Sequence, residues 1–184
     1  MRLTRVLERC AIAVVALAIS IGVIALLSGG LLAGRDEPGV SGNGSPLGTQ
    51  YRDQGDAHLL PGALHPAYDS DPPTSGAHVP VPVSRDRSQL SDDQLLEALE
   101  VGDVVIMYGA SSPPSGLPAL AHSVAAPFTP ALAAAGQAVI LARRPHLRGL
   151  IGLAWSRAIQ VGSVADPSLR SFAVFWLGRG APAR

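Results

Sequence analysis

The pattern of hydrophobic and polar positions divides the chain into a long apolar stretch, a polar connector and a region of short periodic segments. The apolar stretch runs from Cys10 to Gly34 without a charged residue. About 20 apolar residues cross a bilayer as a helix, so this stretch predicts a transmembrane anchor at 10–34. Three basic residues precede it, namely Arg2, Arg5 and Arg9. They predict a cytoplasmic head at 1–9 and an exported C-terminal part.

A cleavable signal peptide is the alternative for the same stretch. Its apolar part usually has about 7–15 residues and ends in small residues, and Ser28-Gly29-Gly30 could serve as a cleavage site. The run from Cys10 to Leu27 alone exceeds that length, which favours an uncleaved anchor. Both alternatives place the rest of the chain outside the cytoplasm, and we expect a single-pass protein of the cytoplasmic membrane.

Residues 35–50 are rich in Gly, Ser and Pro, and this composition predicts a flexible linker. One exported domain should follow at 51–184. Its clearest helix begins at Ser91, which together with Gln94 forms a capping-box pattern. Leucines at helical spacing follow, and Gly102 is a natural terminator.

Shorter segments predict the rest of the domain. Three apolar runs predict strands, at 103–108, 138–142 and 150–157. A helical stretch at 117–135 must be interrupted by its prolines, and a last helix should start at Asp166-Pro167 and run to Trp176. The tail from Gly178 is expected to be loose. The order of these elements predicts a small α/β or α+β domain with a central sheet covered by helices.

Composition excludes several classes of function. The chain has 14 basic and 14 acidic residues, so no net charge favours nucleic acid, and we expect no nucleic-acid partner. Its single cysteine, Cys10, allows no disulfide within the chain. Cys10 also precedes the apolar stretch, which argues against a lipid-modified protein.

A stiff loop offers the first candidate for chemistry. Pro72 and Pro73 fix two consecutive φ angles, Thr74 and Ser75 can bond neighbouring amides, and Gly76 permits a left-handed turn. Such a loop would deliver His78 to a defined place. The alternative is a surface turn with a solvated histidine.

The residues Pro72-Pro73-Thr74-Ser75-Gly76 with His78 resemble the signature of the bacterial family known as domain of unknown function 3105. The pair His58-Leu59 matches a His-hydrophobic pair ahead of that signature, and Ala142–Pro145 and Ala154–Arg157 are similar to later blocks. The resemblance extends from about Tyr51 to Leu177. It implies an uncharacterised, membrane-anchored protein, and it carries no settled activity.

The resemblance also implies a polar motif, His-Ser-Leu-Glu-His-Gly, on the helix before the first core strand. The aligned run here is Glu97-Ala98-Leu99-Glu100-Val101-Gly102. Glu100 and Gly102 match, whereas Glu97 and Val101 replace the two histidines. The motif is therefore degenerate in this chain.

Four residues remain as candidate ligands of a divalent transition metal: His58, His78, Glu97 and Glu100. Our first hypothesis is a binding or interaction domain with a weakened His/Glu site. The second is a metal-dependent enzyme or metal-binding protein that uses His58, His78 and Glu100, with Glu97 as base. A purely structural envelope protein is the third, and Glu97 and Glu100 would then be solvated surface charges. Whether His58, His78 and Glu100 meet in one pocket distinguishes these hypotheses.

Overall fold

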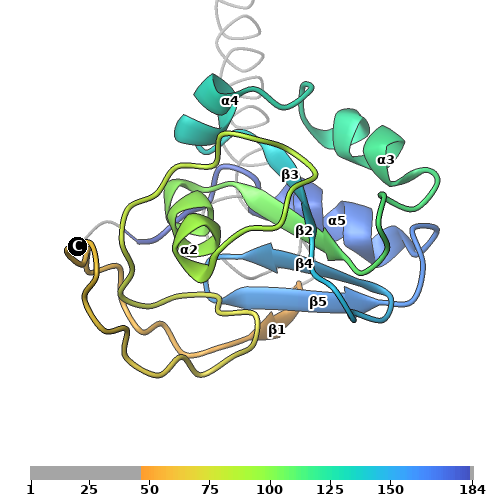
Figure 1. Cartoon of the computed structure of the whole chain (residues 1–184). Helices are drawn as coiled ribbons and strands as arrows, with labels where there is room; N and C mark the ends of the chain where they lie inside the picture. The colour runs from red at the N-terminus through yellow and green to blue at the C-terminus, as the bar shows by residue number, and fades with distance from the viewer. Residues whose placement is uncertain (1–46, 183–184) are drawn as a thin grey trace, which may run out of the picture. The chain divides into compact units, whose positions relative to one another are not determined.

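The computed structural model describes residues 47–182 (Figure 1). Among these residues, none of the helices has both the length and the apolar character needed to cross a bilayer. The predicted head at 1–9, the anchor at 10–34 and most of the predicted linker lie outside the described residues. Residues 49 and 50, at the end of that linker range, form a short strand.

Residues 47–182 fold into one five-stranded mixed sheet with four helices. The strands are β1 (Thr49–Gln50), β2 (Val104–Tyr108), β3 (Val139–Arg143), β4 (Leu150–Ala154) and β5 (Arg157–Val161). The helices are α2 (Asp92–Val101), α3 (Leu117–Val124), α4 (Pro130–Ala134) and α5 (Pro167–Trp176). The strand order is β1-β5-β4-β2-β3, in which β2 and β3 are parallel and the other pairs are antiparallel. The domain is therefore α+β, one of the two classes that the sequence predicted.

Helices cover both faces of the sheet, and α2 crosses in front of it in Figure 1. Side chains alternate along each strand: Val104 and Ile106 of β2 pack with α3 and α5, whereas Val105 and Met107 pack with α2 and α4. All five residues of β2 are buried. The near-continuous apolar run that predicted this strand results from burial on both faces.

Helix α2 forms as its local sequence predicts. The Ser91 side chain accepts a hydrogen bond from the Gln94 N–H, and the Gln94 side chain caps the Ser91 N–H in return. Gly102 ends the helix with a φ of 111°, in the left-handed region. Four apolar residues of α2 are buried, Leu95, Leu96, Ala98 and Leu99, and they fix the orientation of the helix on the sheet.

The prediction of a single strand at 150–157 was wrong. The strand β4 ends at Ala154, a turn follows at Trp155-Ser156, and β5 begins at Arg157. Ser156 adopts a φ of 55°, a left-handed conformation usually supplied by Gly, Asn or Asp. Because none of those residues stands there, the sequence carried no signal of a hairpin.

The predicted loose tail was also wrong. The Gly178 N–H donates to the Gly102 carbonyl at 2.8 Å, and the Ala181 N–H donates to the Glu100 carbonyl at 2.9 Å. The last carbonyls of a helix lack partners within the helix. The tail supplies donors to the C-terminal end of α2, where Glu100 lies.

Candidate metal centre

The segment between β1 and α2 has no long regular element and wraps around α2 (Figure 1). Its proline loop is buried, since Pro72 to Gly76 are all shielded from solvent. The Ser75 hydroxyl donates to the Arg52 carbonyl and accepts from the Gln54 N–H, each at 3.1 Å. The Ser156 N–H donates to the Thr74 carbonyl at 2.8 Å. These contacts confirm a fixed loop and exclude the alternative of a solvated surface turn.

The loop delivers His78 to the surface of α2. The His78 side chain is 0% exposed, and its Nδ1 lies 3.0 Å from the Gly76 carbonyl oxygen. A carbonyl accepts hydrogen bonds and never donates them, so Nδ1 carries the proton in this contact. In the neutral ring Nε2 therefore presents its lone pair toward α2. In metal-bound histidines, the ring nitrogen that does not bind the metal typically makes such an orienting hydrogen bond.

His58 reaches the same place from a neighbouring stretch of chain. His58 and His78 form a parallel β-bridge, in which the Leu59 N–H donates to the His78 carbonyl and the His78 N–H donates to the Ala57 carbonyl. The two imidazole rings meet edge to face with centroids 5.4 Å apart. The His58 side chain remains half exposed, so it forms the outer side of the cluster.

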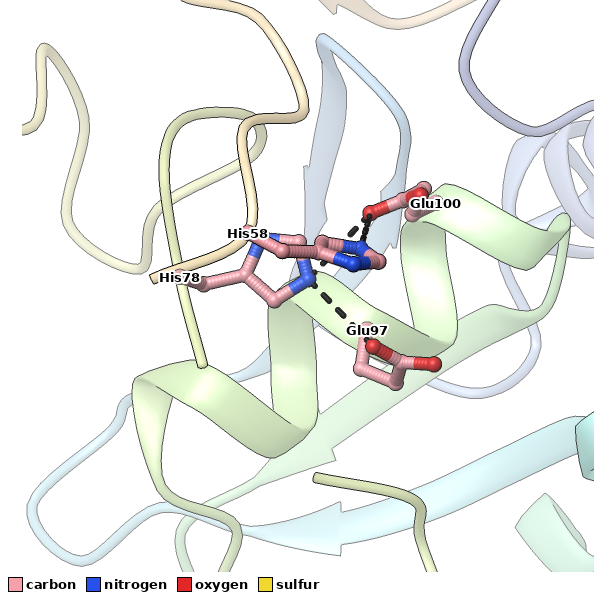
Figure 2. Close-up of side chains that lie close together, drawn as sticks. All are labelled: His58, His78, Glu97 and Glu100. Atoms are coloured by element: carbon pink, nitrogen blue, oxygen red, sulfur yellow. Dashed lines mark hydrogen bonds and ion pairs between the residues drawn. The ribbon is translucent and has the colours of Figure 1, made fainter. Parts of the chain in front are cut away.

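The carboxylates come from α2, where a spacing of three residues puts Glu97 and Glu100 on one face. The Glu100 Oε2 atom lies 3.1 Å from His58 Nε2 and 3.3 Å from His78 Nε2. The Glu97 Oε2 atom lies 3.5 Å from His78 Nε2. Figure 2 shows the four side chains pointing toward one another. All four predicted candidates therefore meet at one place.

The distances suit a four-coordinate ion. One nitrogen or oxygen from each of the four side chains lies within 4.8 Å of the other three. Bonds of about 2.0–2.1 Å at tetrahedral angles place neighbouring ligand atoms roughly 3.3 Å apart, close to the 3.1, 3.3 and 3.5 Å between the imidazole nitrogens and the carboxylate oxygens. Ligand atoms as far apart as 4.8 Å would have to move closer, because two such bonds span at most about 4.2 Å. His78 Nε2 and Glu97 Oε2 are buried and make no hydrogen bond with the described residues. The two atoms lie within ion-pair distance of each other, but buried polar atoms without a hydrogen bond are costly, and a bound cation would satisfy both.

A second polar contact joins the same segment to α2 one turn earlier. Asp93 Oδ1 accepts from the Val79 N–H at 2.8 Å and lies 2.8 Å from His65 Nε2. Burial acts to raise the pKa of Asp93, but the contacts with Val79 and His65 outweigh it and lower the pKa. The sequence analysis gave neither Asp93 nor His65 a role in a site. Nothing local in the sequence signals that the two residues meet.

Asp103 is a further polar residue that sequence reasoning missed. It is 1% exposed, and its Oδ1 accepts from the Ala138 N–H at 2.7 Å while Oδ2 makes no hydrogen bond with the described residues. Burial raises the pKa of Asp103 to about 7. Asp103 and Glu97 line a common cavity of about 80 Å³. The strand pattern had identified position 103 only as the start of a strand.

The family relationship follows from residues 65–182. The model of the family described as Protein of unknown function (DUF3105) matches that range. The chain belongs to this family. Three of the four clustered residues fall within the matched range, whereas His58 precedes it. No curated protein and no solved structure matches the chain significantly.

Proposed function

We propose that this DUF3105 domain binds one divalent transition-metal ion, with Zn²⁺ as the best fit, through His58, His78, Glu97 and Glu100. The observation that carries the proposal is the buried Nε2 atom of His78. Among residues 47–182 no group hydrogen-bonds to this atom, the Gly76 carbonyl sets the tautomer of the ring, and two carboxylates lie 3.3 and 3.5 Å away. An imidazole so placed is prepared for a cation.

The donor set supports a transition metal over the common hard cations. Ca²⁺ takes six to eight oxygen ligands, and Mg²⁺ favours oxygen ligands and water in octahedral geometry. Two imidazole nitrogens and two carboxylate oxygens instead suit Zn²⁺ or ions of similar preference. In this proposal Glu97, which replaces the first histidine of the family motif, exchanges a nitrogen ligand for an oxygen ligand and keeps a donor in place.

The count of ligands favours binding over hydrolysis. Structural zinc sites have four protein ligands, whereas catalytic sites have three and keep a position for water. Four side chains converge here. We therefore propose a metal-binding protein rather than a metal-dependent hydrolase.

Calorimetric titration of the metal-free, full-length chain with Zn²⁺ tests the proposal. We expect one ion per chain, and we expect Glu97→Gln and Glu100→Gln to weaken binding at least about tenfold each. His122→Ala is the matched control, because His122 is exposed on α3 and should leave binding unchanged. Absence of one-to-one binding to the wild-type chain would refute the proposed function.

We also propose that the domain lies outside the cytoplasm, tethered by residues 10–34. The support is the charge-free apolar run and the three arginines ahead of it. Alkaline extraction of cell membranes should leave the full-length chain in the membrane fraction, and protease added outside spheroplasts should digest the domain. Recovery of the chain in the soluble fraction, or protection of the domain from the protease, would contradict the anchor or its orientation.

A further inference from the structure

The two histidines of the cluster are held in place very differently. His78 has a fully buried side chain, an Nδ1 contact with Gly76 and a place at the end of a buried loop. His58 has a side chain that is 50% exposed, and it lies between Ala57, which is exposed, and Leu59, which is partly buried. A buried side chain in a hydrogen-bonded loop has far less freedom than a half-exposed one.

The other three proposed metal ligands are held in place by contacts that do not involve His58. Glu97 and Glu100 stand on a capped helix whose buried leucines pack on the sheet. The backbone of Glu100 is held by the Ala181 N–H from the C-terminal tail. His78 Nε2 lies 3.3 Å and 3.5 Å from the two carboxylates. These three side chains form a preorganised half-site on the inner side of the cluster, opposite the half-exposed His58.

The stretch that carries His58 has few contacts that could fix it. Two backbone hydrogen bonds tie Ala57 and Leu59 to His78, and the half-exposed His58 side chain contacts Glu100 Oε2 through Nε2 at 3.1 Å. Beyond these contacts, Leu60 and Leu64 are 80% and 94% exposed. Most of residues 57–64 are exposed, with Leu59 and Ala63 partly buried, and we call this stretch the His58 arm.

We propose that His58 is the closing ligand of the metal centre. The ion first binds the half-site of His78, Glu97 and Glu100 from the solvent side, and coordination by His58 then orders the His58 arm. This inference rests on the proposed metal binding and adds a conformational consequence to it. The His58 arm and the exchange of metal would then be coupled, because the ion cannot leave until His58 swings outward.

Amide hydrogen–deuterium exchange of the full-length chain, with and without saturating Zn²⁺, tests this inference. We expect Zn²⁺ to slow exchange in the His58 arm about tenfold or more at short labelling times, before the buried strands β2 and β4 have exchanged. We also expect His58→Ala to bind Zn²⁺ at least about tenfold more weakly and to lose the slowing in the arm.

The matched control is His65→Ala. His65 belongs to the same segment but contacts Asp93 and stands outside the four-residue cluster. This variant should bind Zn²⁺ as the wild type does and should retain the slowing of exchange in the His58 arm.

The outcomes separate this inference from the proposed function. A wild-type chain that binds one Zn²⁺ without slower exchange in the arm would overturn the closing role of His58 and leave metal binding intact. The same holds if His58→Ala binds Zn²⁺ as tightly as the wild type. A wild-type chain that binds no Zn²⁺ would overturn both.

Discussion

Asp103 carries an ionisable carboxyl group where the surrounding structure favours its neutral form. Its pKa is raised to about 7 by burial, whereas an aspartate in the unfolded chain ionises near 3.9. Between about pH 4 and pH 7 the folded state therefore holds one more proton than the unfolded state. The contribution of Asp103 to the free energy of unfolding falls as pH rises through this window and is constant above it.

We expect Asp103→Asn to remove that decline. Asparagine keeps an oxygen that can accept from the Ala138 N–H and cannot ionise. Urea unfolding of the wild type should show stability falling by up to about 1.4 kcal/mol per pH unit across the window, relative to the variant. Asp69→Asn is the control, because Asp69 is exposed. Parallel pH profiles for the wild type and Asp103→Asn would contradict this assignment.

At the scale of single elements, the parts that sequence predicted are those whose signals are local. All the determinants of α2 lie between Ser91 and Gly102: the capping box, the leucine spacing and the terminating glycine. The helix starting at Asp166 was predicted for the same reason, since Asp166 caps it and Pro167 occupies its first turn. Such elements are specified by residues within a few positions of one another.

The elements that sequence missed depend on distant partners. The strand β5 exists because it pairs with β4 through a turn at Ser156, whose positive φ has no sequence signal. The tail is fixed by carbonyls at the C-terminal end of α2, those of Glu100 and of the capping Gly102. Pairings of this kind can be identified only from the backbone hydrogen bonds of the folded structure.

The candidate site also combines features that the sequence predicted with contacts between residues far apart in the chain. The stiff proline loop drew attention to His78, and the resemblance to the family added His58, Glu97 and Glu100. Their convergence depends on the β-bridge between the two histidines and on the packing of α2, neither of which is a local property. Asp93 and Asp103 were missed because their partners, Val79 and Ala138, lie far away in sequence.

On the scale of the whole molecule, the metal centre lies where the irregular segment before α2 meets the packed helices and sheet. The irregular side contributes His58 and His78, and α2 contributes Glu97 and Glu100. Unfolding of the domain would separate these ligands, so an ion bound to all four favours the folded state. Ligand binding of this kind stabilises a protein in proportion to the logarithm of ligand concentration.

We therefore expect Zn²⁺ to raise the unfolding temperature of the full-length chain. At a free concentration 100 times the dissociation constant the gain is about 2.7 kcal/mol, which corresponds to roughly 10 °C for a domain of this size. The shift should grow with the logarithm of Zn²⁺ concentration, and differential scanning calorimetry measures it directly. Ca²⁺ at the same concentrations should produce no shift, because the site offers too few oxygens.

Glu97→Gln supplies the internal comparison for the thermal measurement. The substitution preserves the size of the side chain and removes one charge from the half-site, so the metal-free protein should unfold at nearly the wild-type temperature. The Zn²⁺-dependent shift should shrink in step with the weaker affinity. If Zn²⁺ raised the unfolding temperature of both proteins equally, the ion would bind at another place on the chain. The two histidines that lie against α2 and the two glutamates on it would then contribute to the stability of the fold alone.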